Sequence, residues 1–227
     1  MDVVYPLGTG SHHDNIELLY SLRSIDKHLT GFDKVWIVGE LPRWVKNVNH
    51  IKVPDDPKKC SDWNIMIKTT VATTMAALSE DFLFMNDDHF FLQPMDASKI
   101  PYYYCDTLET FIKQRGLDTY GRRVKNTLKL LNSRSLPTKY FDIHYPIIYN
   151  KSLFLYTVTK QDWTEPFIIK SLYCNSLNIE GEFAKDNKLN DPPRTAMKVF
   201  STMPRIKGSI LQFLRANFPK PSRYEKQ

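Results

Sequence analysis

The sequence predicts an α/β fold in which a mostly parallel sheet is flanked by helices. Strand-like and helical segments alternate through roughly the first 90 residues, as in chains that build such sheets. The run Phe82–Met85 is apolar on both faces, which a central parallel strand covered by helices requires. With 227 residues, 42% of them hydrophobic, the chain can bury one sizeable core. We therefore expect a single domain over 1–227, with its ligand crevice outside the carboxyl ends of the strands.

The elements of the first half follow from periodicity. Residues 2–7 are β-branched and aromatic and run into a glycine loop, which indicates a strand. Apolar residues at helical spacing then predict a helix over 15–29, ended by Gly31. The next elements expected are strands over 34–38, 50–53 and 82–85, and a helix over 61–79.

The second half has weaker periodicity. Helices are expected over 106–115, 120–131, 166–177 and 209–216, and a strand over 140–148.

Several protein classes are excluded by simple counts. The apolar runs fall far short of the roughly 18 to 20 residues that a membrane span needs. The N-terminus has no basic start followed by an apolar stretch, so no secretory signal is expected. Cys60, Cys105 and Cys174 are far apart, which indicates neither a disulfide framework nor a zinc site. A cytoplasmic, reducing environment is therefore expected.

The charge is unevenly distributed. Residues 111–139 hold eight Lys or Arg against Asp118 alone, a charge of +7, and residues 194–227 hold eight against Glu225 alone, again +7. The formal net charge is +6, so the rest of the chain carries −8. Basic segments of this kind suit nucleic acid or a multiply charged phosphate ligand. A solvated helix face is the equal alternative.

Two adjacent carboxylates follow the expected central strand, in Asn86-Asp87-Asp88. Like charges in a crevice raise each other's pKa, and a divalent cation keeps both ionised. Oxygen ligands suit Mg²⁺ or Mn²⁺, which complete their shells with phosphates and water. The pattern therefore predicts a metal-dependent nucleotide or nucleotide-sugar site. The alternative is a turn in which Asp87 or Asp88 caps the next element.

Other polar residues are candidates for holding such a ligand. The loop Gly8-Thr9-Gly10-Ser11 offers backbone N–H groups to a nucleotide, although a plain tight turn is as good a reading. Asn64 and Lys68 share a helix face, where Lys68 can neutralise a diphosphate and Asn64 can bind a base or ribose; solvated positions are the alternative. Arg23 can reach a phosphate or a surface acid.

His144 alternates with Asp142 along the expected strand over 140–148, so the two share a face. The histidine has two candidate roles, as a late ligand to the same metal or as a base toward an acceptor hydroxyl. A hydrogen-bonded core histidine is the alternative.

These residues together resemble a family of small GT-A-type glycosyltransferases, the phage-encoded group linked to hypermodified DNA bases (the type associated with TET/JBP enzymes). The resemblance covers nearly the whole chain, is weakest over 100–138 and includes the signature Asn86-Asp87-Asp88-His89-Phe90-Phe91. Further matching segments are 2–11, 15–24, 38–44, 144–146 and 221–226. The outline is also similar to bacterial polysaccharide-synthesis transferases that place Asn-Asp-Asp after a central strand.

The resemblance implies a nucleotide-sugar-binding half over 1–100 and an acceptor-binding half over 101–227. It implies Asp87, Asp88 and His144 as metal residues, with Asp88 and His144 also catalytic. The nucleotide and diphosphate contacts carried over are Leu7, Gly8, Thr9, Gly10, Ser11, Glu40 and Asn86. The signature is Asn-Asp-Asp and not the commoner Asp-x-Asp, so the order in which the two aspartates meet the ion is open.

The leading hypothesis is transfer of a hexose, with UDP-glucose as the expected donor, onto the hydroxyl of a 5-hydroxymethylpyrimidine in DNA. A base, if one acts, is His144, Asp142 or Glu182, in that order. The segment 111–139 and the basic C-terminus would hold the DNA, and the host cytoplasm would be the location if the source is viral. A transferase for surface or capsular polysaccharide and a non-catalytic nucleic-acid-binding module are the competing hypotheses.

Overall fold

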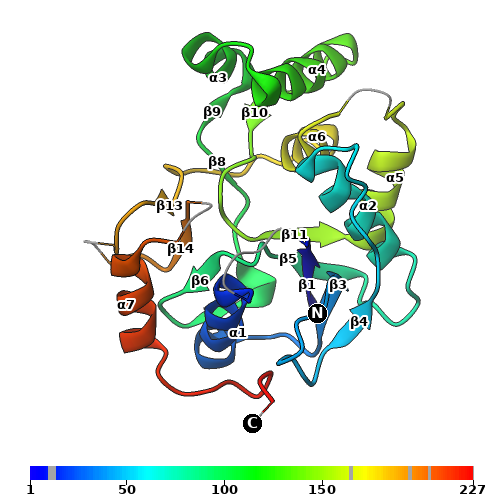
Figure 1. Ribbon diagram of the computed structural model, residues 1–227. Helices are drawn as coiled ribbons and strands as arrows, with labels where there is room; N and C mark the ends of the chain where they lie inside the picture. The colour runs from blue at the N-terminus through cyan, green and yellow to red at the C-terminus, as the bar shows by residue number, and fades with distance from the viewer. Residues whose placement is uncertain (10–13, 164–165, 194–195, 204–205, 227) are drawn as a thin grey trace.

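A five-stranded sheet forms the centre of the chain in a computed structural model that describes residues 1–9, 14–163, 166–193, 196–203 and 206–226 (Figure 1). The strand order is β11-β5-β1-β3-β4, in which the last four are parallel and β11 is antiparallel to β5. The strands are β1 (Asp2–Leu7), β3 (Val35–Gly39), β4 (Asn49–Ile51), β5 (Asp81–Phe84) and β11 (Ile147–Asn150). The predicted mostly parallel sheet is confirmed.

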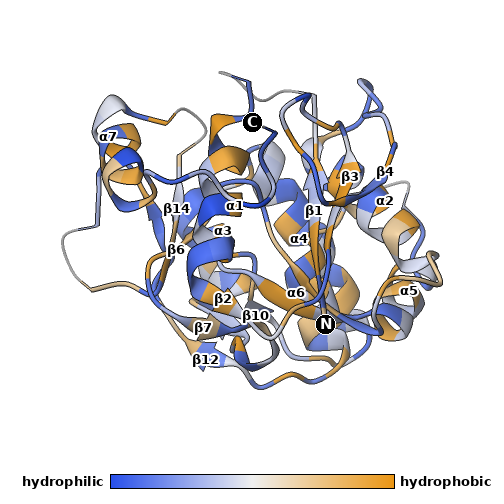
Figure 2. Cartoon of the chain, turned by 90° about the horizontal axis from the view of Figure 1, so that it is seen from below, coloured by the Kyte–Doolittle hydropathy of each residue, from blue (hydrophilic) through white to orange (hydrophobic). Residues whose placement is uncertain are grey.

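Helices cover both faces of this sheet. Successive residues of β1 point to opposite faces, so Val3 and Tyr5 pack in a cluster with α1 (Ile16–His28), whereas Val4 packs in a cluster with α2 (Ser61–Thr73). The second face is also covered by α5 (Lys151–Thr159) and α6 (Ile169–Ser176). Figure 2 shows the apolar strands β1 and β3 between helices that have hydrophilic stretches.

A second, three-stranded sheet lies beside α1. Its order is β13-β14-β6, from Lys188–Leu189, Val199–Thr202 and His89–Phe91. Phe90 and Phe200 pack with α7 (Gly208–Asn217) and Tyr20 of α1. Neither β13 nor β14 was predicted, because strands of two to four residues have too few positions to show a period. Their position places residues of the late chain beside the acidic turn that follows β5.

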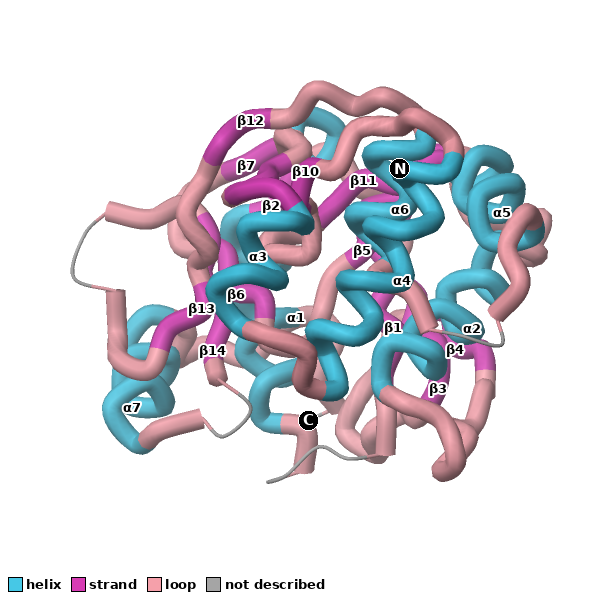
Figure 3. Tube along the Cα trace, turned by 90° about the horizontal axis from the view of Figure 1, so that it is seen from above, coloured by secondary structure: helices cyan, strands magenta, loops and turns pink. Residues whose placement is uncertain are grey.

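Residues 106–140 form an arm that projects from the body (Figure 1). Its stalk is the antiparallel pair β9 (Asp106–Thr107) and β10 (Lys139–Tyr140), and its head is α3 (Leu108–Arg115) and α4 (Thr119–Ser133). Figure 3 shows α4 running between α3 and α6. The remaining short elements are β2 (Leu29–Thr30), β7 (Met95–Asp96), a 3₁₀ turn (Ala97–Lys99), β8 (Tyr103–Tyr104) and β12 (Glu182–Phe183).

The expected strand over 140–148 is wrong. Only its ends are extended, in β10 and β11, and residues 141–146 cross between them as a loop. The Lys170 ammonium donates to the carbonyls of Ile143 (2.8 Å) and Tyr145 (2.7 Å), which anchors the loop from α6. Because the loop is not a strand, Asp142 and His144 do not share a face.

The predicted set of helices also needs two corrections. The second helix ends at Thr73 and not near 79, and α5 was not predicted. The other helices lie within a few residues of their predicted ranges.

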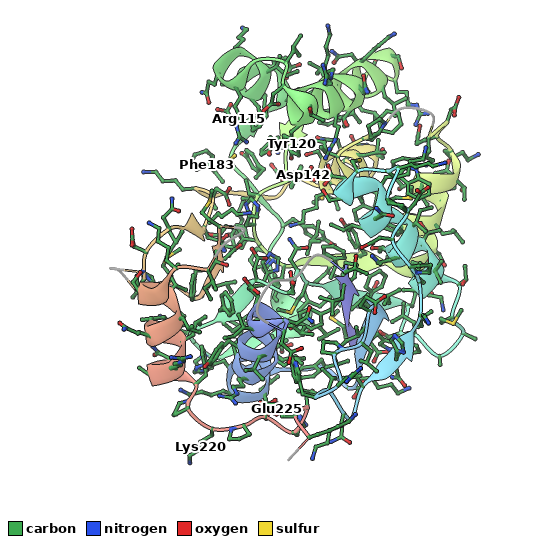
Figure 4. All side chains as sticks on the ribbon, viewed as in Figure 1. Arg115, Tyr120, Asp142, Phe183, Lys220 and Glu225 are labelled. Carbon is green, nitrogen blue, oxygen red and sulfur yellow. The ribbon has the colours of Figure 1, made fainter. Side chains whose placement is uncertain are left out.

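The C-terminal segment 218–226 packs against α1 and the turn before β4. Glu225 accepts two hydrogen bonds from Arg23, at 2.9 and 2.6 Å, and Arg223 pairs with Asp26. This segment lies at one end of the molecule and the arm at the other, as the labelled Lys220, Glu225 and Arg115 show (Figure 4). Residues 218–226 and the arm therefore do not form one surface. Among the described helices, none combines the length and apolar character that crossing a membrane requires.

Candidate active site

A cavity of about 480 Å³ opens at the carboxyl edge of the main sheet, where the topology predicts a ligand site. Its volume lies within the usual range of small-molecule pockets. One wall comes from the ends of β1 and β4 and from α2, and the other comes from the turn after β5 and from β13 and β14. The lining residues are Pro6, Gly8, Glu17, Asp55, Ser61, Asn64, Ile65, Lys68, Asn86, Asp87, Asp88, Lys188, Thr202 and Met203.

The acidic turn between β5 and β6 is held in place by His89. The Asn86 N–H donates to His89 Nδ1 at 3.2 Å, and the His89 N–H donates to the Asn86 carbonyl at 3.3 Å. Burial, with Lys170, His144 and Lys188 nearby, holds the pKa of His89 well below its usual value. The ring is therefore neutral and can accept through Nδ1. The turn presents Asp87 and Asp88 to the cavity.

The two aspartates of this turn have different environments. Asp88 accepts a hydrogen bond from the Ser201 hydroxyl at 2.6 Å, so β14 fixes its orientation. Burial first, and then the charges of Asp88 and Glu17, raise the pKa of Asp87 to about 7. A bound cation would favour the ionised form of Asp87. A carboxyl with such a raised pKa is typical of a ligand site.

The raised pKa of Asp87 predicts a pH-dependent stability. Between pH 3.8 and about 7 the folded protein binds more protons at this carboxyl than the unfolded chain does, so the free energy of unfolding falls as pH rises through this window. Asp87→Asn removes this dependence. We expect the variant to match the wild type near pH 4 and to be about 4 kcal/mol more stable at pH 8, measured by urea unfolding. Equal stabilities at pH 8 would contradict the raised pKa.

Lys68 and Asp55 form an ion pair in the opposite wall of the cavity, and the Lys68 side chain is 3% exposed. Asp55 also accepts from the backbone N–H (3.0 Å) and the hydroxyl (3.3 Å) of Thr9, so it ties the loop after β1 to α2. Burial raises the pKa of Asp55, but the hydrogen bonds from Lys68 and Thr9 outweigh it, and the net pKa is below its usual value. A Cβ at Gly39 would clash with the Leu7 carbonyl oxygen and lie 2.7 Å from Lys68 Cε, so a glycine leaves room for both the backbone of β1 and the lysine.

Asn64 holds the loop that carries Asp55. Its side-chain oxygen accepts from the Asp56 N–H at 2.8 Å, and its amide donates to the Asp56 carbonyl at 3.1 Å. Asp55 was not among the predicted site residues. Its position after a parallel strand, at the same edge as Asp87, was the available signal.

Lys188 was also missed, and it connects the cavity to His144. The Lys188 ammonium lies 3.0 Å from His144 Nε2, and His144 Nδ1 lies 2.9 and 3.0 Å from the two carboxylate oxygens of Asp186. Lys188 lines the cavity, whereas His144 and Asp186 are not among its lining residues. The sequence signal for Lys188 was weak, because this residue lies in a two-residue strand far along the chain from Asn86-Asp87-Asp88.

A divalent cation fits the acidic turn but not the predicted three-residue set. Asp87 and Asp88 supply the hard oxygen donors that Mg²⁺ and Mn²⁺ prefer. Both ring nitrogens of His144 have partners in Asp186 and Lys188. Within the described ranges, no three His, Cys, Asp or Glu side chains gather as a metal-binding group. The structure therefore does not bring His144 together with the acidic pair as a ligand.

Several other predicted site residues lie outside the cavity lining. Arg23 pairs with Glu225 and donates to the Phe218 carbonyl at 2.9 Å, so it binds the C-terminal segment and not a phosphate. Leu7 is buried in the core, and Glu40 is exposed in the turn after β3. Gly10 and Ser11 fall outside the described residues, whereas Gly8 lines the cavity and Thr9 contacts its wall.

Asp142 and Glu182 are also away from the cavity. The Asp142 carboxylate accepts from the backbone N–H (2.8 Å) and hydroxyl (2.6 Å) of Ser171 and so caps α6. Figure 4 places Asp142 below Tyr120, at the base of the arm. Glu182 is exposed in β12. Of the three candidate bases, only His144 is joined to the cavity, through Lys188.

Comparison with known proteins gives a likeness of fold. No family model matches the chain, and no curated protein matches it. A crystal structure of an active-site mutant of LgtC is similar over 98% of both chains, with a TM-score of 0.50 and 11% sequence identity. Galactosyltransferase LgtC with donor and acceptor sugar analogues aligns over 78% of this chain and 70% of that one (TM-score 0.43, 11% identity). Mouse xyloside xylosyltransferase 1 aligns over 79% and 82% (TM-score 0.39, 8% identity). The chain thus has the mixed α/β fold of GT-A glycosyltransferases.

Proposed function

We propose that the protein is a metal-dependent glycosyltransferase that takes its sugar from a nucleotide-sugar donor. The observation that carries the proposal is the cavity at the carboxyl edge of the sheet, with Asp87 and Asp88 on one wall and Gly8, Asn64 and Lys68 on the other. The fold that the chain shares with LgtC supports the same conclusion. A nucleoside suits the wall of Gly8 and Asn64, and a diphosphate suits the acidic turn when it carries a cation.

The chain's own residues prepare this site before any ligand binds. Ser201 and His89 fix the acidic turn, and Asn64 and Asp55 fix the loops on the opposite wall. Asp87 and Asp88 would hold Mn²⁺ or Mg²⁺, which when bound supplies positive charge to the departing diphosphate. Preorganised groups need little rearrangement during the reaction. This preorganisation is the main source of electrostatic catalysis.

For the acceptor we propose the hydroxyl of a 5-hydroxymethylpyrimidine in DNA, with UDP-glucose as donor. The support is the resemblance described above and the charge of the arm. Arg122, Lys125 and Lys129 are exposed on α4, while Val124 and Leu131 of the same helix are buried. These three cations form a stripe, here called the arm stripe, that suits a phosphate backbone. Arg123 is excluded from the stripe because it pairs with Asp62 of α2.

The test is nucleoside mass spectrometry after incubation with Mn²⁺, a panel of nucleotide sugars and DNA that carries hydroxymethylcytosine or hydroxymethyluracil. A new nucleoside heavier by one hexose supports donor and acceptor together. Donor hydrolysis without a nucleoside product would retain the transferase and reject DNA as its acceptor. That result would favour a polysaccharide acceptor. Nucleic-acid binding without any turnover of donor would favour the non-catalytic module.

The arm stripe gives a sharper prediction. Replacing Arg122, Lys125 and Lys129 by Gln should lower DNA modification by at least roughly tenfold at 0.15 M salt, because fewer counterions are released from DNA. Donor hydrolysis should not change, because the stripe is outside the cavity lining. A triple variant of Lys34, Lys52 and Lys99, which are exposed and lie outside both basic segments, removes the same charge and is the control. Equal losses in both variants would contradict a specific role of the arm.

A further inference from the structure

The two lysines that line the cavity differ in how their charge is balanced. Lys68 forms an ion pair with Asp55, so its charge is neutralised where it lies. Lys188 instead contacts the imidazole of His144, at 3.0 Å. Across the ranges that the structure describes, no carboxylate lies within ion-pair distance of Lys188. Of the two, Lys188 is therefore the one that offers net positive charge to an anion.

His144 and Asp186 fix the direction of Lys188. Asp186 accepts from the backbone N–H of His144 at 2.9 Å and from its ring Nδ1 at 2.9 and 3.0 Å. A proton on Nδ1 leaves the lone pair on Nε2, which accepts a hydrogen bond from the Lys188 ammonium. A neutral acceptor orients the ammonium without cancelling its charge, which a carboxylate in the same place would do.

The small sheet places Lys188 close to the acidic turn. Lys188 pairs in register with Ser201 of β14, and Ser201 in turn pairs with His89 of β6. The same Ser201 donates its hydroxyl to Asp88. The loop that carries His144 is anchored by Lys170. The position of Lys188 is thus set by backbone pairing on one side and by the His144 ring on the other.

We infer that Lys188 binds the diphosphate of the donor and that His144 and Asp186 are positioning residues for it. This inference rests on the proposed function. As the bond between sugar and phosphate breaks, negative charge grows on the departing diphosphate. A preoriented ammonium therefore stabilises the transition state more strongly than it stabilises the bound donor. Lys68, which the sequence analysis assigned to the diphosphate, instead holds Asp55 and the loops around it.

The binding test compares a nucleoside diphosphate with its nucleoside. UDP, GDP and CDP, and the corresponding nucleosides, are titrated by calorimetry with and without Mn²⁺ into wild type, Lys188→Met and Lys188→Arg. The control is Lys185→Met, which removes an exposed lysine three residues away. We expect Lys188→Met to weaken diphosphate binding by at least roughly tenfold and to leave nucleoside binding unchanged. Lys188→Arg should retain part of the effect.

The kinetic test separates binding from turnover. Lys188→Met should lower kcat for donor hydrolysis by about 10² and raise KM much less, because the charge interaction is strongest in the transition state. Asp186→Asn should lower kcat by roughly tenfold, with the wild-type melting temperature retained. In ¹⁵N NMR spectra, the same change should shift His144 from the Nδ1-protonated form to a mixture of tautomers. Asp186→Glu should restore part of the activity.

Two outcomes keep this inference distinct from the proposed function. A wild type that turns over a nucleotide sugar, beside a Lys188→Met variant within twofold of it in kcat and diphosphate affinity, would overturn the role of Lys188 alone. A wild type that binds none of the three nucleoside diphosphates and turns over no donor would overturn the proposed function and this inference with it.

Discussion

Asp87→Asn combined with Asp88→Asn is expected to lower the turnover of a nucleotide sugar by at least roughly 10³, because the acidic turn loses the charge that holds a divalent cation. The protein should stay folded, since the amides keep the shape of the carboxyls and Asn at 87 removes a group whose pKa is raised by burial. The measurement is donor hydrolysis with Mn²⁺, beside calorimetric titration of Mn²⁺.

The matched control for the double variant is Asp33→Asn with Asp191→Asn. Both carboxylates are exposed, at 77% and 62%, and neither lines the cavity. This control should keep full activity. A double variant at Asp87 and Asp88 that turns over donor at the wild-type rate would reject metal-dependent transfer. If the double variant instead binds nucleic acid more tightly and the wild type has no turnover, the non-catalytic module would be favoured.

Asp55→Ala should be among the most destabilising single changes at the site. It leaves the Lys68 ammonium unpaired, with its side chain only 3% exposed, and it also removes the acceptor for Thr9. Breaking a buried ion pair on one side costs about 3 to 5 kcal/mol, because the remaining charge is left without a partner or water. The measurement is the free energy of unfolding in urea.

Two further variants separate the ion pair from other effects at Asp55. Adding Lys68→Met to Asp55→Ala should recover a large part of the lost stability, because the buried charge is removed as well. Asp56→Ala changes the neighbouring carboxylate, whose one hydrogen bond within the described residues comes from the Lys58 N–H in the same turn, and should cost about 1 kcal/mol or less. A loss below about 1 kcal/mol for Asp55→Ala would show that water solvates Lys68 in the cavity.

The main sheet and its ligand edge were predictable because their signals are local. The strand at Asp2–Leu7, the amphipathic helix after it and the apolar strand before Asn86 each show their period within one segment. The rule that ligands bind at the carboxyl ends of parallel strands then placed Gly8, Asp87 and Asp88 together, and the cavity lining contains all three. Asn64 and Lys68 also line the cavity, as their shared helix face suggested.

Other residues depended on contacts that no local pattern records. Asp142 and His144 alternate in the sequence, yet they diverge because Lys170 and Ser171, from a later helix, hold the chain as a loop. Arg23 interrupts an amphipathic helix in the way a ligand residue can, but Glu225, 202 positions away, is its partner. The sequence by itself determined the sheet, its ligand edge and the acidic turn, because hydrophobic period and turn chemistry act over a few residues. Only the tertiary structure decided that Lys68 pairs with Asp55 while Lys188 has no ion-pair partner among the described residues, because an ion pair depends on which distant segments pack side by side.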